Sequence, residues 1–412
     1  MRRVVVTGLG MLTPLGNDVA TSWDGLIAGR SGIDYITAFD AGQFECPIAG
    51  ELKGFDVEAV VDRKMLRRMD RSSVLAIAAA REAVADAGLD LSTMPSEDIG
   101  VVLGTGMGGG HLIVDNQQLM DARGARRVSP FMIAQMLPDT ATGLIAIELG
   151  AHGPNMAVTA ACATGGAAAG EAAEIIARGD AEVIVTGGFE APVRPIYYAG
   201  FSAMRALARH DDPTMAARPF DAERNGFVVA EGAGVMVMES LEHAQQRGAE
   251  IYGEWMGSAS ASDAVDMVAA ADDGRGIVVA MRRALKRAGL QPAEIDYINA
   301  HGPGTPLGDR VESQAIRRVF AEDADAVMVS STKSMIGHMM GASGAIEAMV
   351  ALLTTQRGVV PPTINYANPD PDCDLDYVPN EAREADVKYA MSTSVGLGGH
   401  NSAIIFGRWE GE

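Results

Sequence analysis

Cysteine is scarce in this chain of 412 residues. Its three cysteines, Cys46, Cys162 and Cys373, are too few and too scattered for a disulfide framework or a zinc site, so we expect no bound metal. Unpaired cysteines are typical of a reducing compartment. The sequence therefore predicts a cytoplasmic protein.

Positive charge is also in deficit, because 33 Lys and Arg stand against 54 Asp and Glu, for a net charge of −21. Binding to nucleic-acid phosphates needs a basic footprint, so this balance excludes a general nucleic-acid binder. Two basic clusters stand out against it, Arg63-Lys64 with Arg67-Arg68 and Arg123 with Arg126-Arg127. Each is either a solvated helix face or a docking site for an acidic partner.

Long apolar runs are missing as well, since His, Pro, Asn or a charged residue interrupts each of them. No membrane span is therefore predicted. The first eight residues are typical of a strand and lack the features of a signal peptide. Hydrophobic residues at 48% and charged residues at 21% are ordinary for a globular protein.

Glycine is abundant, at 48 residues, and short strands alternate with alanine-rich helices. The expected strands are 4–8, 99–104, 157–160, 183–186, 297–300, 327–330 and 402–406, and the expected helices are 72–88, 140–150, 164–179, 276–289 and 341–354. Such alternation predicts an α/β fold with largely parallel sheets covered by helices on both faces. A comparable order returns after about residue 250, which indicates two similar halves, 1–250 and 251–412, in a single unit.

Cys162 lies between an apolar strand, 156–160, and a helix of small residues that begins at about 163. A thiol at a helix N-terminus favours the thiolate, which is the nucleophilic form. The alternative is an inert buried cysteine that acts as a small hydrophobe. Partner residues must decide between the two.

Two histidines follow core elements in the second half of the chain. His301 comes directly after strand 296–300, and His338 comes just ahead of the helix that begins near Gly341. Lone histidines are more often structural, but these occupy the ends of elements, where ligands bind α/β sheets. A thiolate and two imidazoles suit acyl transfer, in which cysteine holds a thioester and N–H groups stabilise an oxyanion or an enolate.

Three segments around these residues resemble the signature blocks of β-ketoacyl-acyl carrier protein synthases. They are Ala161-Cys162-Ala163-Thr164-Gly165, Asn299-Ala300-His301-Gly302, and Ser331-Thr332-Lys333-Ser334 followed by Gly337-His338. Flanking matches such as Arg218-Pro219-Phe220-Asp221 and Gly398-Gly399-His400-Asn401 extend the resemblance over essentially the whole chain. The most similar branch is the elongating enzymes, especially synthase II.

The resemblance implies a thiolase-like fold of five layers, αβαβα, built from two related halves and assembled as a homodimer. It implies that an acyl carrier protein delivers an acyl chain on phosphopantetheine, with no other cofactor bound. The chain would be transferred to Cys162 and condensed with malonyl-carrier, with loss of carbon dioxide, to a β-ketoacyl product two carbons longer.

Residue roles follow from the same resemblance. Cys162 is the nucleophile, and His301 and His338 promote decarboxylation and stabilise the enolate. Lys333 and Glu347 form a supporting charged pair, and the backbone N–H groups of Cys162 and Leu397 form the oxyanion hole. The expected substrate contacts are Thr305, Met107, Leu397 and Gly398, and the expected carrier-docking surface is Arg63, Lys64, Arg67, Arg68, Arg126, Arg127 and Arg205.

The chain departs from synthase II at a few positions. Pro303 replaces a threonine, which removes a hydroxyl contact to pantetheine. Val395 and Leu397 replace two phenylalanines, which predicts a looser gate and a broader or altered primer preference unless neighbouring side chains repack. Asp266 stands where histidine is usual.

Other functions stay open on these departures. One is a ketosynthase subunit of a type II polyketide or polyene pathway, and another is a non-catalytic partner like a chain-length factor. Retention of Cys162 argues against the latter. A thiolase is not expected, because it would carry a second cysteine near Gly398-Gly399, where this chain has His400. A type III synthase is not expected either, because it would pair its cysteine with one histidine and an asparagine.

Overall fold

The computed structural model describes residues 1–411, with ten strands in the hydrogen-bonded order β10-β9-β13-β14-β8-β1-β7-β6-β4-β5. In chain order these strands are β1 (Val4–Leu12), β4 (Ile99–Gly104), β5 (Asn155–Val158), β6 (Val183–Glu190), β7 (Gly232–Ser240), β8 (Gly253–Ser262), β9 (Tyr297–Asn299), β10 (Met328–Ser330), β13 (Tyr389–Gly396) and β14 (His400–Arg408). Short strands β2 (Asp34–Tyr35) and β3 (Ile48–Ala49) pair with each other, as do β11 (Val359–Val360) and β12 (Arg383–Glu384).

The ten strands fall into two sets with the same connectivity. In the first set, β1 pairs antiparallel with β7 and β7 with β6, while β6, β4 and β5 are parallel. In the second set, β8 pairs antiparallel with β14 and β14 with β13, while β13, β9 and β10 are parallel. The sets meet where Val4–Val6 of β1 pair with β8. This repetition confirms the thiolase-like fold, whereas the division at residue 250 stays a prediction.

The prediction of largely parallel sheets is wrong, because each set is mixed. The antiparallel pairs involve β7, β8 and β13, which were not expected from the sequence. The strand expected to end before Gly187-Gly188 also continues, as β6, to Glu190. Glycine is needed at position 188 because a Cβ there would be 2.4 Å from the carbonyl oxygen of Gly341.

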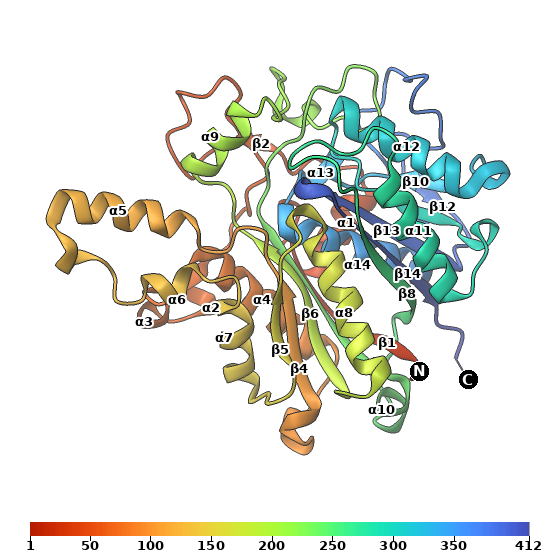
Figure 1. Ribbon diagram of the computed structural model, residues 1–412. Coiled ribbons are helices and arrows are strands. Elements are labelled where there is room, and N and C mark those ends of the chain that lie inside the picture. Colours follow the sequence, from red (N-terminus) through yellow and green to blue (C-terminus); the bar gives the residue numbers. More distant parts are fainter. Residues whose placement is uncertain (412) are drawn as a thin grey trace.

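Helices form three layers around the two strand sets (Figure 1). The described helices, within and outside these layers, are α1 (Val19–Ile27), α2 (Val57–Val60), α3 (Arg63–Leu66), α4 (Arg71–Asp86), α5 (His111–Arg123), α6 (Met132–Met136), α7 (Thr140–Leu149), α8 (Thr164–Arg178), α9 (Pro195–Ala203), α10 (Leu241–Gln246), α11 (Arg275–Ala288), α12 (Pro306–Phe320), α13 (Lys333–Ile336) and α14 (Ser343–Arg357). α8 and α14 pack against each other and against both strand sets. α4 and α7 cover the first set, and α11, with α12 beside it, covers the second.

The middle layer is closely packed because small residues line the contact between its two helices. A Cβ on Gly165 of α8 would lie 2.4 Å from the backbone nitrogen of Ala345 in α14, and one on Gly344 would lie 2.8 Å from the nitrogen of Gly166. Small residues at such contacts let helix backbones approach. The starts of both helices are therefore held close together at the centre of the molecule.

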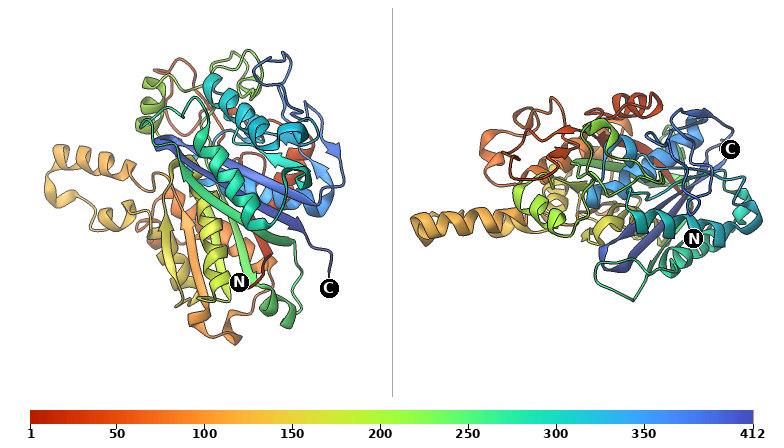
Figure 2. Two further views of the ribbon diagram at one scale, coloured as in Figure 1. Left: turned by 45° about the vertical axis from the view of Figure 1, so that its right-hand side comes forward. Right: turned by 90° about the horizontal axis from the view of Figure 1, so that it is seen from above.

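α5 and the segment that follows it form an arm that protrudes from the body (Figures 1 and 2). Apolar side chains on and beside this arm are exposed, including Ile113 at 47%, Phe131 at 37% and Ile133 at 61%. Within residues 1–411, no helix has both the length and the apolar character needed to cross a membrane.

Candidate active site

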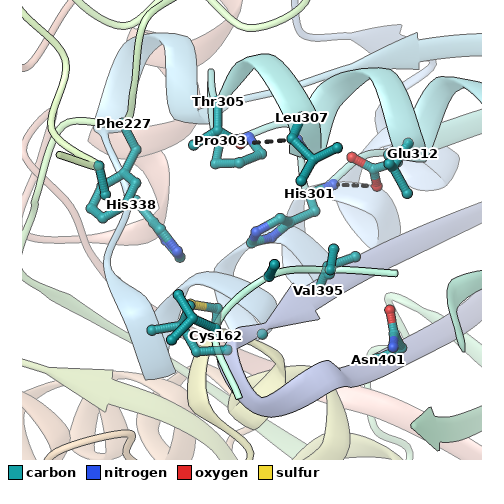
Figure 3. Close-up of a pocket in the computed structure, with 18 of the residues that line it drawn as sticks. Cys162, Phe227, His301, Pro303, Thr305, Leu307, Glu312, His338, Val395 and Asn401 are labelled. Carbon is teal, nitrogen blue, oxygen red and sulfur yellow. Dashed lines mark hydrogen bonds between the residues drawn. The ribbon is translucent and has the colours of Figure 1, made fainter. Parts of the chain in front are cut away.

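A cavity of about 350 Å³ opens between the two halves and is lined by Cys162, His301 and His338. Figure 3 shows both imidazole rings directed into the space beside Cys162. The ring centroids are 5.3 Å apart and the rings are nearly perpendicular, at 82°. The fold thus brings together three residues that the sequence separates widely, although their chemical roles stay predictions.

Cys162 lies in a 3-10 turn, η4 (Ala161–Ala163), that leads directly into α8. Ala161 before it has a left-handed backbone, with φ 48°, which costs a non-glycine residue free energy. The turn is held by Thr164, whose hydroxyl oxygen accepts the N–H of Ala160 at 2.8 Å. These constraints place the thiol, which is 8% exposed, in the cavity wall.

Burial opposes the preference for thiolate that the helix start is expected to give Cys162. Burial raises the pKa of the Cys162 thiol to about 11, although the Lys333 ammonium and the N–H of Leu397, which donates to the sulfur, both lower it. The carboxylates of Glu190 and Glu347 raise this pKa further. Desolvation of the charged form outweighs the favourable groups at this depth, so the resting group is a thiol.

His301 is held by the buried ammonium of Lys333. The Nζ atom of Lys333 lies 2.7 Å from the His301 carbonyl oxygen and 3.3 Å from its Nδ1 atom, and it also donates to Glu347. An ammonium only donates, so Nδ1 of His301 accepts and the ring hydrogen is on Nε2. Burial and the Lys333 charge hold the pKa of His301 well below its usual value, which keeps the ring neutral.

His338 is held by a hydroxyl group instead. Its Nδ1 atom lies 2.9 Å from the oxygen of Ser343, which also accepts the N–H of Met339 at 2.9 Å. A hydroxyl can donate to Nδ1 or accept from it, so either ring nitrogen of His338 can carry the hydrogen. Burial and Lys333 hold the pKa of His338 well below its usual value, so this ring is neutral too.

Two buried acids of α12 fix the turn that carries His301. Glu312 accepts the N–H groups of His301 at 2.9 Å and Gly302 at 2.8 Å, and Asp309 accepts that of Gly304 at 3.0 Å. Position 303 lies between Gly302 and Gly304, whose N–H groups are bonded to the two acids. Proline has no N–H that would need a partner there, so it fits the turn. Pro303 lines the cavity, where it supplies no hydroxyl to a substrate.

The other predicted substrate contacts divide into two groups. Thr305 and Leu397 line the cavity. Met107 and Gly398 are not among the described residues of its wall. Met107 instead is partly buried and packs against the apolar cluster that contains Cys162. Gly398, with φ 80°, turns the loop and donates its N–H to the carbonyl of Met267.

Asp266 has a local structural explanation. Its carboxylate accepts the N–H groups of Val268 at 2.7 Å and Ala269 at 2.9 Å, and these bonds lower its pKa. The residue therefore shapes the exposed loop that carries Val268 and Ala269 into the cavity wall.

The predicted docking residues are all exposed. Arg63 and Lys64 belong to α3 and Arg67 and Arg68 follow it, while Arg126 and Arg127 form a 3-10 turn after α5 and Arg205 follows α9. Arg68 lies over the ring of Phe131, 5.1 Å from its centroid, which places the first basic cluster against the returning segment of the arm. Arg205 is next to Met204, which lines the cavity.

Comparison with known families adds an independent observation to this geometry. The family described as "Beta-ketoacyl synthase, N-terminal domain" matches residues 1–244, and "Beta-ketoacyl synthase, C-terminal domain" matches residues 252–367. The chain belongs to the β-ketoacyl synthase family. The resemblance found in the signature segments is thereby confirmed.

Relatives of this β-ketoacyl synthase are similar over their full length. It is 50% identical over 410 residues to a 3-oxoacyl-[acyl-carrier-protein] synthase 2 of Staphylococcus aureus, covering 99% of each chain. It is 35% identical to a β-ketoacyl synthase structure from Burkholderia phymatum, with a TM-score of 0.92 and 100% of each chain covered. A type II polyketide ketosynthase, solved with its acyl carrier protein and bound to the hexaketide, is 33% identical with a TM-score of 0.92, covering 99% of this chain and 100% of that one.

Several polar residues of this β-ketoacyl synthase site were not predicted from the sequence. Glu312, Asp309 and Ser343 hold the histidine segments, and Glu190 holds the loop after β4. One signal was available, because Asp309 and Glu312 share a face of α12 with apolar residues. Acids on such a face need buried partners.

Proposed function

We propose that this chain is an elongating condensing enzyme of the synthase II type in fatty acid synthesis. It takes an acyl chain from an acyl carrier protein onto Cys162 and joins it to malonyl-carrier with loss of carbon dioxide. The observation that carries this proposal is the cavity in which Cys162 meets two neutral, buried imidazoles contributed by the other half of the fold.

In the first step, the sulfur of Cys162 attacks the carbonyl carbon of the acyl thioester and the carrier's pantetheine thiol leaves. The thiol proton passes to Nε2 of His338, which is free to accept when Nδ1 donates to Ser343, and then to the departing sulfur. The N–H groups of Cys162 and Leu397 face the oxyanion, consistent with the bond from Leu397 to the Cys162 sulfur.

In the second step, malonyl-carrier loses carbon dioxide and the electron pair forms an enolate. The Nε2–H of His301 donates to the enolate oxygen. His338 is the second donor in its other tautomer, in which Ser343 donates to Nδ1 and the hydrogen is on Nε2. The enolate carbon then attacks the acyl-Cys162 carbonyl, a carbon–carbon bond forms, and the carbon–sulfur bond breaks. The Cys162 thiolate that leaves takes a proton from solvent water. Neutral histidines suit this task, because each must present an N–H without carrying a charge into the cavity.

The substrate arm is phosphopantetheine supplied by the carrier, and the enzyme itself holds no cofactor. Pro303, Thr305 and Leu307 line the cavity on the side of His301 and would border the arm. The exposed arginines near α3 and after α5 would dock the acidic carrier, since complementary charge speeds encounter.

The protein would act in the cytoplasm, because its three cysteines are all free and a reducing compartment keeps cysteines unpaired.

The test is acylation followed by condensation. Wild-type protein and C162S are incubated with acyl-carrier, and the intact protein mass is measured. We expect one acyl adduct on the wild type only, and a product two carbons longer once malonyl-carrier is added. No adduct with any primer would instead favour a scaffold that resembles a chain-length factor.

A polyketide or polyene ketosynthase is the second candidate, favoured by the small side chains of Val395 and Leu397 in the cavity wall. Leu397 is 38% exposed, so its neighbours do not enclose the space that a larger gate residue would take. Primers of graded length and branching are offered together to the wild type and L397F. A narrowed product profile in L397F supports a gating role, whereas an unchanged profile refutes it.

We further propose that the enzyme acts as a homodimer. β5 lies at the end of the strand order, and no strand of residues 1–411 pairs with its outer edge. Exposed apolar side chains surround it, with Met156 at 38% and Ile147 at 80%. Open strand edges and apolar patches favour association. Light scattering should give the mass of two chains, and I147E should shift it toward one.

A further inference from the structure

Glu190 is a buried carboxylate beside the cavity that the proposed chemistry does not use. It ends β6 and is 1% exposed. Burial raises its pKa to about 7, and within residues 1–411 no ion pair with a cation is found. A carboxyl group buried in this way needs hydrogen bonds to compensate for lost water.

Four donors from two separate segments supply those bonds. From the loop after β4, Glu190 accepts the hydroxyl of Thr105 at 2.7 Å and the N–H groups of Gly106 at 2.6 Å and Met107 at 3.3 Å. From the second half of the chain, it accepts the N–H of Gly341 at 3.1 Å. One side chain therefore joins the loop after β4 to the turn that starts α14.

Two glycines beside the carboxylate leave the space that it occupies. A Cβ on Gly106 would lie 3.0 Å from Oε2 of Glu190, and a Cβ on Gly341 would lie 2.7 Å from the same atom. Any larger residue at either position would push the carboxylate away from its donors. The two glycines and the acid thus form one fitted contact.

The two joined segments contribute apolar side chains around the nucleophile. Met107 follows Gly106 directly, and Met340 precedes Gly341. Met340 belongs to the apolar cluster that contains Cys162, and Met107 is partly buried and packs against that cluster. Met340 also lines the cavity. The acyl chain on Cys162 must lie against such side chains, so their spacing limits what the thioester can hold.

We propose that Glu190 is a positioning residue that sets Met340, which lines the cavity, and Met107, which packs behind it against the same apolar cluster, around the acyl thioester. The proposal rests on the proposed acyl transfer to Cys162. The role proposed for Glu190 affects acylation and decarboxylation differently. His301 is held by Lys333 and His338 by Ser343, and neither histidine is bonded to Glu190. Loss of Glu190 should therefore impair acylation of Cys162 more than decarboxylation of malonyl-carrier.

The decisive variant is E190Q, which keeps the side-chain size. A glutamine has only one acceptor oxygen, and its NH₂ group would face N–H donors. We expect kcat/KM for acylation to fall about tenfold, and further for longer chains, because small displacements of bound substrate are costly. Release of carbon dioxide from malonyl-carrier should change less than about twofold.

Glu82 provides a matched control in the outer layer. It also has a pKa raised to about 7 by burial, and it accepts the N–H groups of Met11 and Val19, each at 2.8 Å. E82Q should lose thermal stability with both partial reactions unchanged.

T105V removes one donor to Glu190 and should lower acylation about threefold, whereas T105S keeps the hydroxyl and should match the wild type.

Several results would overturn the proposal. Wild-type acylation by E190Q at all chain lengths refutes it, and so does an equal loss of both partial reactions, which marks a purely structural role. If E190Q does not fold, identical acylation by T105V and T105S refutes it. Absence of any adduct on the wild type refutes the proposed function itself, whereas normal wild-type acylation with an unaffected E190Q refutes only the role of Glu190.

Discussion

The starts of α8 and α14 share one backbone design but serve different purposes. Ala161 and Met340 have left-handed backbones, with φ 48° and 45°, and each begins a 3-10 turn that leads into a helix. In each turn the first helical residue, Thr164 or Ser343, accepts the N–H of the residue four positions earlier. The same local structure thus occurs once in each half.

The difference lies at the position after the left-handed residue. It is Cys162 in the α8 turn and Gly341 in the α14 turn. Cys162 faces the cavity, whereas the N–H of Gly341 is bonded to Glu190 and its carbonyl packs on Gly188. One turn therefore presents the proposed nucleophile, and the other has no side chain at this position, which lets the two halves approach closely.

Replacement of Cys162 gives the largest expected effect and tests the chemical side of this comparison. C162A should lower condensation by at least about a thousandfold, because the proposed nucleophile of the cavity is lost. Malonyl-carrier decarboxylation should persist, since both histidines keep their partners. Product mass and carbon dioxide release measure the two activities. A condensation rate near that of the wild type would show that another group carries the acyl chain.

The pKa of Cys162 shows which of two opposed effects is larger, because burial raises this pKa and the start of α8 lowers it. With a pKa of about 11, the group is a thiol at neutral pH and gains thiolate as the pH rises. Alkylation by iodoacetamide should accelerate about tenfold per pH unit between roughly pH 7 and 10, followed by peptide mass. A plateau below about pH 8 would mean that the start of α8 dominates over burial.

Adding a methyl group to the α14 turn tests its packing role. In G341A the new Cβ would lie 2.5 Å from the nitrogen of Gly106 and 2.7 Å from Glu190. We expect the free energy of unfolding to fall by about 3 kcal/mol, measured by denaturant titration. A Cβ on Gly143 in α7 would have nothing within 4 Å of it, so G143A should be neutral or stabilising by up to about 1 kcal/mol.

The smallest expected effect separates the two capping hydroxyls. T164V removes the acceptor for the partly buried N–H of Ala160, and S343A removes the acceptor for the buried N–H of Met339. Each change should lower the free energy of unfolding by about 1 kcal/mol. Only S343A also frees Nδ1 of His338, so it alone should slow malonyl decarboxylation, by about tenfold. Equal decarboxylation rates in the two variants would contradict the assignment of Ser343 as a partner of His338.

The sequence predicted the architecture well because strand and helix alternation is a local pattern. α8 and α14 were expected within a few residues of their observed bounds, and the layered fold followed from the resemblance. β7, β8 and β13 were not expected because they lie in a continuous antiparallel arrangement, rich in small residues, that lacks a clear alternating pattern. Register across strands depends on distant pairing that a local pattern does not contain.

The sequence predicted that Cys162, His301 and His338 share one site and that Lys333 pairs with Glu347, but it did not predict the other residues that support the site. Cys162, His301 and His338 carry distinctive motifs, whereas Glu190 and Glu312 bond mainly to backbone N–H groups of distant segments. Every residue except proline has a backbone N–H, so the sequence does not indicate which of them will donate to a buried carboxylate. The raised pKa of Cys162 was also out of reach, because desolvation depends on how deeply the fold covers the thiol.

The split of the cavity between the two strand sets has a consequence for the growing polypeptide. Cys162 emerges during translation well before Lys333, Ser343 and Glu347, which orient the imidazoles. A ribosome-bound fragment that ends before these residues lacks the groups proposed to release carbon dioxide. We therefore expect release of carbon dioxide to begin only after Ser343 and Glu347 have been added to the chain and the second strand set has folded.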